Sequence, residues 1–187
     1  MLKKTLLAAA VFAFATTTVQ ANEVSGYVTG SMGQSDSKDF RSDTDFAYKV
    51  AVGLQANPYV ALEAQYTDLG KPSDKGLVVD NFGNLYNAKV TAKTRGLGAN
   101  LVGTLPLDDF KLFAKVGYHK METKVRVKVA GVGSGSATAR EWVPSFGAGA
   151  SYAIMPELEI VAEYERYKDV ADAYNVDLAS VGLRYNF

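Results

Sequence analysis

The chain has 187 residues, in which 20 lysines and arginines balance 20 aspartates and glutamates, with one histidine and no cysteine. A chain of this length typically forms one domain, and its zero net charge argues against a nucleic-acid binder, whose domains are usually strongly basic. Without cysteine there is no disulfide, thiolate metal site or cysteine nucleophile. Because His119 is the sole imidazole, we expect neither a metal nor another cofactor.

The N-terminus has the three-part pattern of a secretory signal peptide. Lys3 and Lys4 give a basic start, residues 6–15 form an unbroken apolar run, and a site of the small-x-small type ends at Ala21. A membrane-spanning helix needs about 20 apolar residues, so this run is too short to be an anchor. We therefore predict a cleaved signal peptide over 1–21 and a mature domain over 22–187.

Beyond residue 22 the dominant hydrophobic period is two, which is typical of β-strands. In the clearest segment, Leu97, Leu101 and Leu105 share one face, whereas Asn100 and Thr104 occupy the other. Eight segments show this alternation: 24–33, 49–55, 60–67, 97–105, 111–120, 145–152, 158–165 and 180–187.

The connections between these segments alternate in length. Three are short, at 57–58, 106–109 and 155–157, and four are long, at 34–44, 69–89, 124–140 and 168–177. An even number of antiparallel strands with short turns at one end and long loops at the other is typical of outer-membrane barrels. We predict an all-β fold, an eight-stranded antiparallel up-and-down transmembrane β-barrel.

Hairpin registers follow from matching apolar residues across strands. Leu97 is expected opposite Tyr118, Leu105 opposite Phe110, and Tyr152 opposite Leu158. A slip by one residue would turn every side chain to the other face, so the apolar match supports the assignment of faces.

The bulky apolar face is predicted to point outward. An eight-stranded barrel has an interior only just wide enough for side chains, and the other face consists mostly of small residues with a few charges. A secreted soluble β-domain would instead need the bulky face inside. Aromatic residues are expected at both membrane rims: Tyr48, Tyr66, Tyr118 and Tyr164 at one, and Phe110, Tyr152, Tyr185 and Phe187 at the other.

Three stretches resemble the transmembrane domain of OmpA-type proteins: QANPYVALEAQYTDLG at 55–70, PSFGAGASYAI at 144–154 followed by Pro156-Glu157, and VGLRYNF at 181–187. The resemblance covers 22–187 apart from the loops. It implies a Gram-negative outer-membrane location, a periplasmic N-terminus, and a terminal Phe187 of the kind that the barrel-assembly machinery recognises. Because the chain ends at Phe187, we expect no peptidoglycan-binding domain, as in the short OmpX-like relatives.

Six charged residues fall on the predicted lumen face, and unpaired charge is costly there. We expect them to form an ion-pair network: Lys49, Glu63, Lys115, Glu163, Glu165 and Arg184. The network either stiffens and closes the barrel or acts as a gate that rearranges. Among OmpA-like barrels, Glu63 matches an acidic and Lys115 a basic interior position, which makes these two the expected pair. The family's other gate positions are Val102, Ser151 and Val161 here, so its gate chemistry is not preserved.

A second charged set lies beyond the predicted membrane. Residues 123–129 alternate Val with Lys or Arg, which predicts a strand that runs past the bilayer. In the expected register Arg95 faces Lys120 and Lys89 faces Arg126, and like charges opposite one another are unfavourable. An anion would relieve the repulsion, so we predict a lipopolysaccharide contact patch: Lys89, Lys93, Arg95, Lys120, Lys124 and Arg126. The alternative is a solvated strand extension.

No catalytic residues are expected. His119 lies on the lumen side near one rim, no Gly-x-Ser-x-Gly elbow is present, and residues 131–136 are expected to form a flexible loop tip.

The sequence therefore favours a non-enzymatic surface protein that supports envelope integrity and contacts host or surface ligands through its loops, with weak porin-like activity at most. The alternatives are a small-solute or ion channel gated by the lumen network and an enzyme that hydrolyses lipids or peptides.

Overall fold

The computed structural model describes residues 25–37, 45–71, 73–79, 85–129, 133–170 and 174–187. No helix in these ranges is long and apolar enough to span a bilayer. The described strands are β1 (Gly26–Ser37), β2 (Asp45–Asn57), β3 (Val60–Asp68), β4 (Ser73–Val79), β5 (Leu85–Leu107), β6 (Phe110–Val129), β7 (Gly133–Met155), β8 (Leu158–Val170) and β9 (Tyr174–Asn186).

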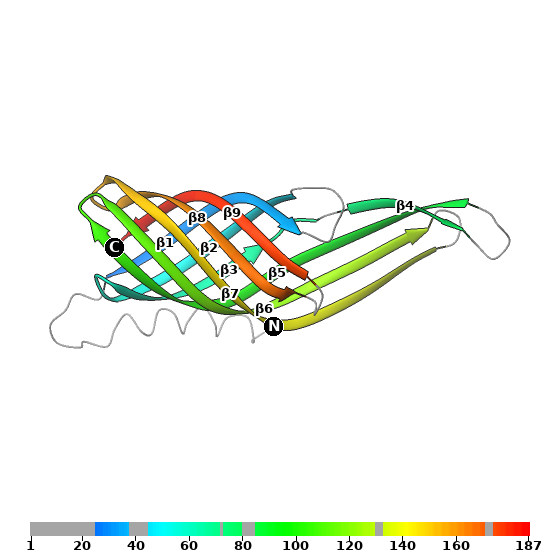
Figure 1. Cartoon of the computed structure of the whole chain (residues 1–187), viewed down its shortest axis with the longest axis horizontal. Coiled ribbons are helices and arrows are strands. Elements are labelled where there is room, and N and C mark those ends of the chain that lie inside the picture. Colours follow the sequence, from blue (N-terminus) through cyan, green and yellow to red (C-terminus); the bar gives the residue numbers. More distant parts are fainter. Residues whose placement is uncertain (1–24, 38–44, 72, 80–84, 130–132, 171–173) are drawn as a thin grey trace, which may run out of the picture.

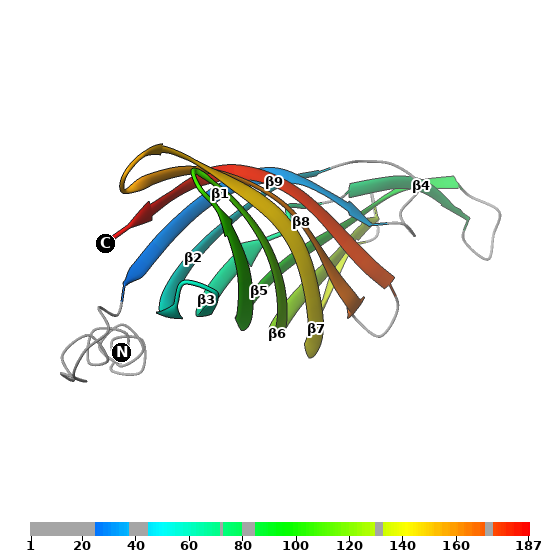
Figure 2. The ribbon, with the colours of Figure 1, turned by 60° about the vertical axis from the view of Figure 1, so that its left-hand side comes forward.

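Eight of these strands form a closed antiparallel ring. Neighbours follow the order β3-β2-β1-β9-β8-β7-β6-β5, and pairing of β3 with β5 closes it. Figure 1 and Figure 2 show the tilted strands curving around a common axis. Closure pairs the backbone groups that an open sheet would leave at its edges. The predicted eight-stranded antiparallel barrel is confirmed.

The ring has an extension that the predicted loops did not include. β5, β6 and β7 continue beyond the other strands, and β4 pairs with the first part of β5 (Figure 1). The prediction of loops over 69–89 and 124–140 is therefore wrong for most of these residues, whereas the predicted continuation of 123–129 as a strand is confirmed. The β-branched residues in these stretches favour extended backbone even outside the membrane.

Three two-residue turns connect strands at one end of the barrel, which we call the turn end; the opposite end is the loop end. The β5–β6 turn consists of Asp108 and Asp109, with Asp108 in the left-handed region at φ 53°. Leu107 therefore pairs directly with Phe110. The β5–β6 and β7–β8 turns are shorter than predicted, with two residues instead of four and three, and the registers of both hairpins shift accordingly.

The predicted registers are wrong by two residues. Leu97 lies opposite Lys120 instead of Tyr118, and Tyr152 lies opposite Ile160 instead of Leu158. The β7–β8 hairpin also contains a bulge between Ala153 and Met155. A shift by two leaves each side chain on its original face, so the assignment of faces does not change.

The predicted orientation of the two faces is confirmed. Leu101, Val116 and Leu183 are 54%, 59% and 52% exposed, whereas the lumen-facing Lys49 and Glu165 are buried. Of the aromatic residues expected at the rims, all but the partly buried Tyr66 are exposed on the outer surface, and Trp142 joins those at the loop end. Exposed apolar side chains between two aromatic bands match a barrel that faces lipid.

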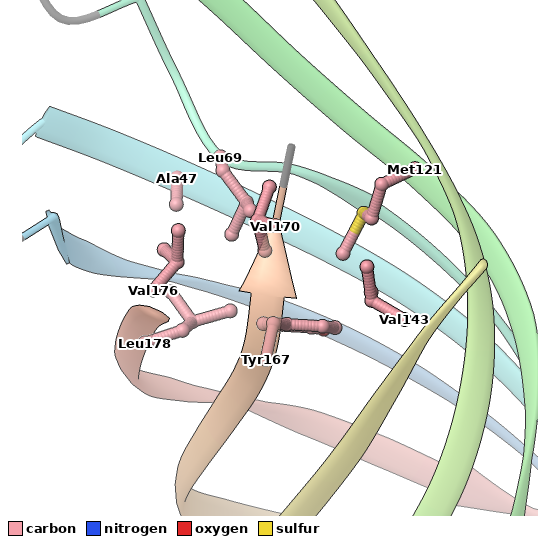
Figure 3. Close-up of a cluster of buried hydrophobic side chains, with 8 residues drawn as sticks. All are labelled: Ala47, Leu69, Met121, Val143, Tyr167, Val170, Val176 and Leu178. Carbon is pink, nitrogen blue, oxygen red and sulfur yellow. The ribbon is translucent and has the colours of Figure 1, made fainter. Parts of the chain in front are cut away.

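Two apolar clusters fill the lumen at different heights. The lower plug, near the turn end, consists of Tyr27, Ala61, Val102, Phe113 and Val161. The upper plug, near the loop end, consists of Ala47, Leu69, Met121, Val143, Tyr167, Val170, Val176 and Leu178, whose side chains converge in Figure 3. Lumen glycines make room for large neighbours, since a Cβ at Gly53 would collide with the Tyr27 ring and one at Gly117 with Asn100.

Candidate functional sites in the lumen and on the outer face

Between the two plugs lies the lumen cluster, which contains five of the six charged residues predicted for the lumen. Lys115 Nζ lies 2.5 Å from Glu163 Oε1 and 3.4 Å from Glu63 Oε1 and Glu165 Oε2. Lys49 Nζ lies 2.6 Å from the other oxygen of Glu163. Glu163 thus bridges two ammonium groups, and all five side chains are almost completely buried.

Neutral donors support the carboxylates, which outnumber the ammonium groups in this cluster. The Tyr27 hydroxyl and the Asn100 amide donate to the two oxygens of Glu63, each at 2.9 Å. Gln65 donates to Glu165 at 3.0 Å and accepts from Lys115 at 2.5 Å. A connected buried network of this kind fixes one arrangement of side chains because each member restrains its neighbours.

Arg184 lies apart from the cluster, at the lower plug. Its guanidinium packs 4.3 Å from the Tyr27 ring and 5.2 Å from the Phe113 ring, in cation–π geometry. Its carboxylate neighbour is Glu159, at 3.7 Å, which also accepts from Lys111 at 2.5 Å. The predicted set of six is therefore divided between two sites.

The family's remaining gate positions take a different role here. Val102 and Val161 belong to the lower plug, and Ser151 is buried on the same inner wall. Neither valine can form an ion pair or a side-chain hydrogen bond with Glu63. Its cationic partner is instead Lys115, at 3.4 Å.

His119 is completely buried in the lumen cluster. The Asn100 amide nitrogen donates elsewhere, so its oxygen accepts from His119 Nε2 at 2.8 Å. The ring also meets Tyr167 edge-on, with centroids 5.3 Å apart. These contacts account for His119 as an internal packing and hydrogen-bonding residue.

On the outer face, rows of side chains cross β5, β6 and β7. The row at the aromatic rim is Leu97–Lys120–Trp142, and the next row outward is Arg95–Glu122–Arg140. The predicted repulsion between Arg95 and Lys120 is wrong, because the register shift places Glu122 opposite Arg95, with a 2.6 Å ion pair. Lys89 pairs with Lys128 instead of Arg126, and its side chain lies outside the described residues.

The third and fourth rows carry three further cations, of which Lys93 and Lys124 pair with Asp68 and Glu122, whereas Arg126 has no ion-pair partner among the described residues. These rows are Lys93–Lys124–Thr138 and Thr91–Arg126–Ser136. Together with Lys71 they line a pocket of about 520 Å³, which we call the upper pocket. None of the described residues that line it is acidic, and within the described part neither Lys71 nor Arg126 forms an ion pair.

Lys71 reaches the pocket through a sharp bend after β3. Leu69 points into the upper plug, and its N–H donates to Thr94 O at 2.9 Å. Gly70 then adopts φ +86°, where a Cβ would collide with the Phe46 carbonyl oxygen. This conformation favours glycine, and it brings the chain from the lumen to the outer face within two residues.

A smaller pocket of about 250 Å³ lies lower, at the aromatic rim. Leu97, Tyr66 and Trp142 line it from the membrane side, and Trp142 stacks on Tyr118 with centroids 5.6 Å apart. Lys120 lies between Leu97 and Trp142 and has no ion-pair partner among the described residues. This rim pocket combines an apolar floor with one available cation.

Glu122 should make the extension sensitive to acid. The Arg140 and Arg95 guanidinium groups, which donate to its carboxylate, lower the pKa of Glu122 from 4.5 to about 2. The stabilisation that the ionised Glu122 gives to the folded extension is therefore present above about pH 4.5 and disappears as the pH falls towards about 2. We expect amide hydrogen exchange, corrected for intrinsic rates, to show loss of protection in the outer parts of β6 and β7 in this range. Glu122→Gln should abolish this pH dependence of protection. If the variant loses protection over the same pH range as wild type, Glu122 is not its cause.

The ring, its lipid-facing exterior and its closed lumen define an outer-membrane β-barrel protein. Over residues 5–187 the chain matches the family described as outer membrane protein beta-barrel domain, and it belongs to that family. It is 30% identical over 141 residues to outer membrane protein A of Shigella flexneri, an alignment that covers 72% of this chain. The chain spans 38% of the length of that curated relative.

Solved structures support the same fold. Ail of Yersinia pestis has 16% sequence identity and a TM-score of 0.59, covering 89% of this chain and 100% of Ail. Ail has also been solved with the heparin analogue sucrose octasulfate, at a TM-score of 0.60, 15% identity and the same coverages. The N-terminal barrel domain of Pseudomonas aeruginosa OprF has 12% identity and a TM-score of 0.57, covering 89% of this chain and 100% of that domain.

Proposed function

We propose that the protein is a closed barrel of the Gram-negative outer membrane whose outer face binds the phosphate groups of lipopolysaccharide. The observation that carries the proposal is the set of cationic rows on β5, β6 and β7 directly beyond the aromatic rim. Lys120 would meet phosphates near the apolar boundary, and Lys93, Lys124 and Arg126 would meet anions farther out. The loop end then faces the medium and the turn end faces the periplasm.

The lumen supports a structural role. Two apolar plugs enclose the lumen cluster, and desolvated ion pairs between them hold opposite walls together. An apolar constriction resists ion passage because an ion would have to lose its water there. We propose that the barrel contributes to envelope integrity and conducts weakly at most, so a gated channel is the less favoured function.

The cationic extension also supports surface contacts. The complex of Ail with a highly sulfated sugar is a precedent, in a protein of the same fold, for binding a polyanion. We propose that host or surface ligands of this protein contact the extension of β5, β6 and β7, where exposed bases lie farthest from the membrane.

Export and assembly complete the proposal. Residues 1–21, which lie outside the described residues, would direct secretion and be cleaved. Phe187 is 65% exposed at the turn end, while its backbone exchanges hydrogen bonds of 2.9 and 2.8 Å with Gly26. An accessible aromatic side chain directly after β9 supports the proposal that Phe187 is the signal read by the barrel-assembly machinery.

Removal of the outer cations should weaken lipopolysaccharide binding. Each base near an anionic surface contributes about 1 kcal/mol, so the triple variant Lys120→Ala, Lys124→Ala, Arg126→Ala should bind roughly 100-fold more weakly. The loss of binding is measured as the amount of lipopolysaccharide that the refolded protein retains, which is detected by its gel migration. Lys168→Ala removes an exposed cation from β8 and should behave like wild type. Equal retention by the triple variant would refute the proposed binding face.

A further inference from the structure

The upper pocket has the composition of a phosphate site that works without a divalent cation. Four bases line it, from two neighbouring strands and the β3–β4 connection, and hydroxyl groups of Thr91, Ser136 and Thr138 add neutral donors. Bound Mg²⁺ requires oxygen ligands, usually including carboxylates. No described residue of the lining has a carboxylate.

Two acidic residues at the pocket's membrane-side edge hold part of the cationic set in place. Asp68 lies 3.1 Å from Lys93 Nζ, and Glu122 lies 3.4 Å from Lys124 Nζ. Gly70 N–H donates to the other oxygen of Asp68 at 3.1 Å, which fixes the bend that precedes Lys71. Lys71 and Arg126 have no such partner within the described part and remain available to an anion.

We propose that the upper pocket binds phosphomonoester groups in place of the divalent cations that otherwise neutralise them, so that Mg²⁺ competes with the protein. This inference rests on the proposed function and specifies the anion and its regulation. A phosphate that already carries Mg²⁺ would bring a cation against Lys71 and Arg126, which have no ion-pair partner among the described residues, and these like charges repel one another. The free phosphomonoester carries up to two negative charges and is the form that fits.

The test uses protein refolded into phosphatidylcholine nanodiscs. The probe is a deacylated glucosamine disaccharide with two phosphomonoesters, which has no acyl chain to bind the barrel wall. Calorimetric titration is carried out in chelator with K⁺ and in millimolar Mg²⁺ at the same ionic strength, because matched ionic strength separates competition from general screening. We expect Mg²⁺ to weaken binding about tenfold relative to K⁺.

Matched variants locate the effect. Lys71→Ala and Arg126→Ala should each weaken binding about tenfold in the absence of Mg²⁺, whereas Lys168→Ala should not change it. Binding that is unaffected or strengthened by Mg²⁺ would overturn the inference and leave the proposed lipopolysaccharide binding intact. Absence of probe binding in chelator would also overturn it. The proposed function fails separately, if the triple variant retains lipopolysaccharide as wild type does.

Discussion

Replacement of Lys115 by methionine should lower the free energy of unfolding by about 3–5 kcal/mol, the usual cost of removing one partner of a buried ion pair. Lys115 contacts three carboxylates and the Gln65 carbonyl oxygen, and its side chain is 2% exposed. Without it, Lys49 is the only ammonium group left in the lumen cluster. Urea unfolding of the refolded protein, followed by its shift in gel migration, measures the change.

Two variants make this result interpretable. Arg126→Met removes an exposed cation and should change the free energy of unfolding by less than about 0.5 kcal/mol. Adding Glu163→Gln to Lys115→Met removes one excess negative charge and should restore part of the loss. If Lys115→Met unfolds like wild type, the ion pairs of the cluster do not stabilise the barrel.

Opening both plugs together should convert the closed barrel into a conducting one. Phe113 is a large side chain of the lower plug, and Tyr167 is a fully buried side chain of the upper plug. Because the plugs act in series, Phe113→Ala or Tyr167→Ala alone leaves one apolar barrier in place. We expect unitary current steps in planar bilayers from the double variant but not from wild type or either single variant.

The current should also favour cations, because the lumen cluster between the plugs contains more carboxylates than ammonium groups. Each substitution should cost about 3–5 kcal/mol of stability, so gel migration must first establish that the variants are folded. Regular current steps from wild type would show that the plugs do not seal the lumen, and steps from one single variant would show that they do not act in series.

The sequence predicted the two faces of the barrel but not its strand alignment. Alternation at Leu97, Leu101 and Leu105 determines which side chains meet lipid, and a slip by two residues preserves that pattern. The register depends instead on turn length, and Asp108 with Asp109 forms a tighter turn than the predicted four-residue turn at 106–109. β4 was missed because a strand outside the membrane has no lipid-facing side to produce strong alternation.

The candidate sites were predictable to the extent that charge and strand parity define them. Five lumen charges meet because each lies at mid-strand on the inner face. Glu159 was missed because it lies next to the β7–β8 turn, and Gln65 and Asn100 because neutral residues are common on that face. Lys71 gave no periodic signal, since its position depends on the backbone bend at Gly70.

The pairing of β1 with β9 has a consequence for how the chain acquires its structure. These strands are far apart in the sequence, and they meet in register from Tyr27 with Asn186 to Ser37 with Val176. A cylinder joined in this way has high contact order, which slows folding. The barrel cannot close while the chain is still being made, because closure requires β1 to pair with the thirteen-residue β9. Until β9 pairs with β1, the nascent sheet has two edge strands with unpaired backbone groups, which can associate with other chains. This is a physical reason why a chaperone would be needed before the barrel closes.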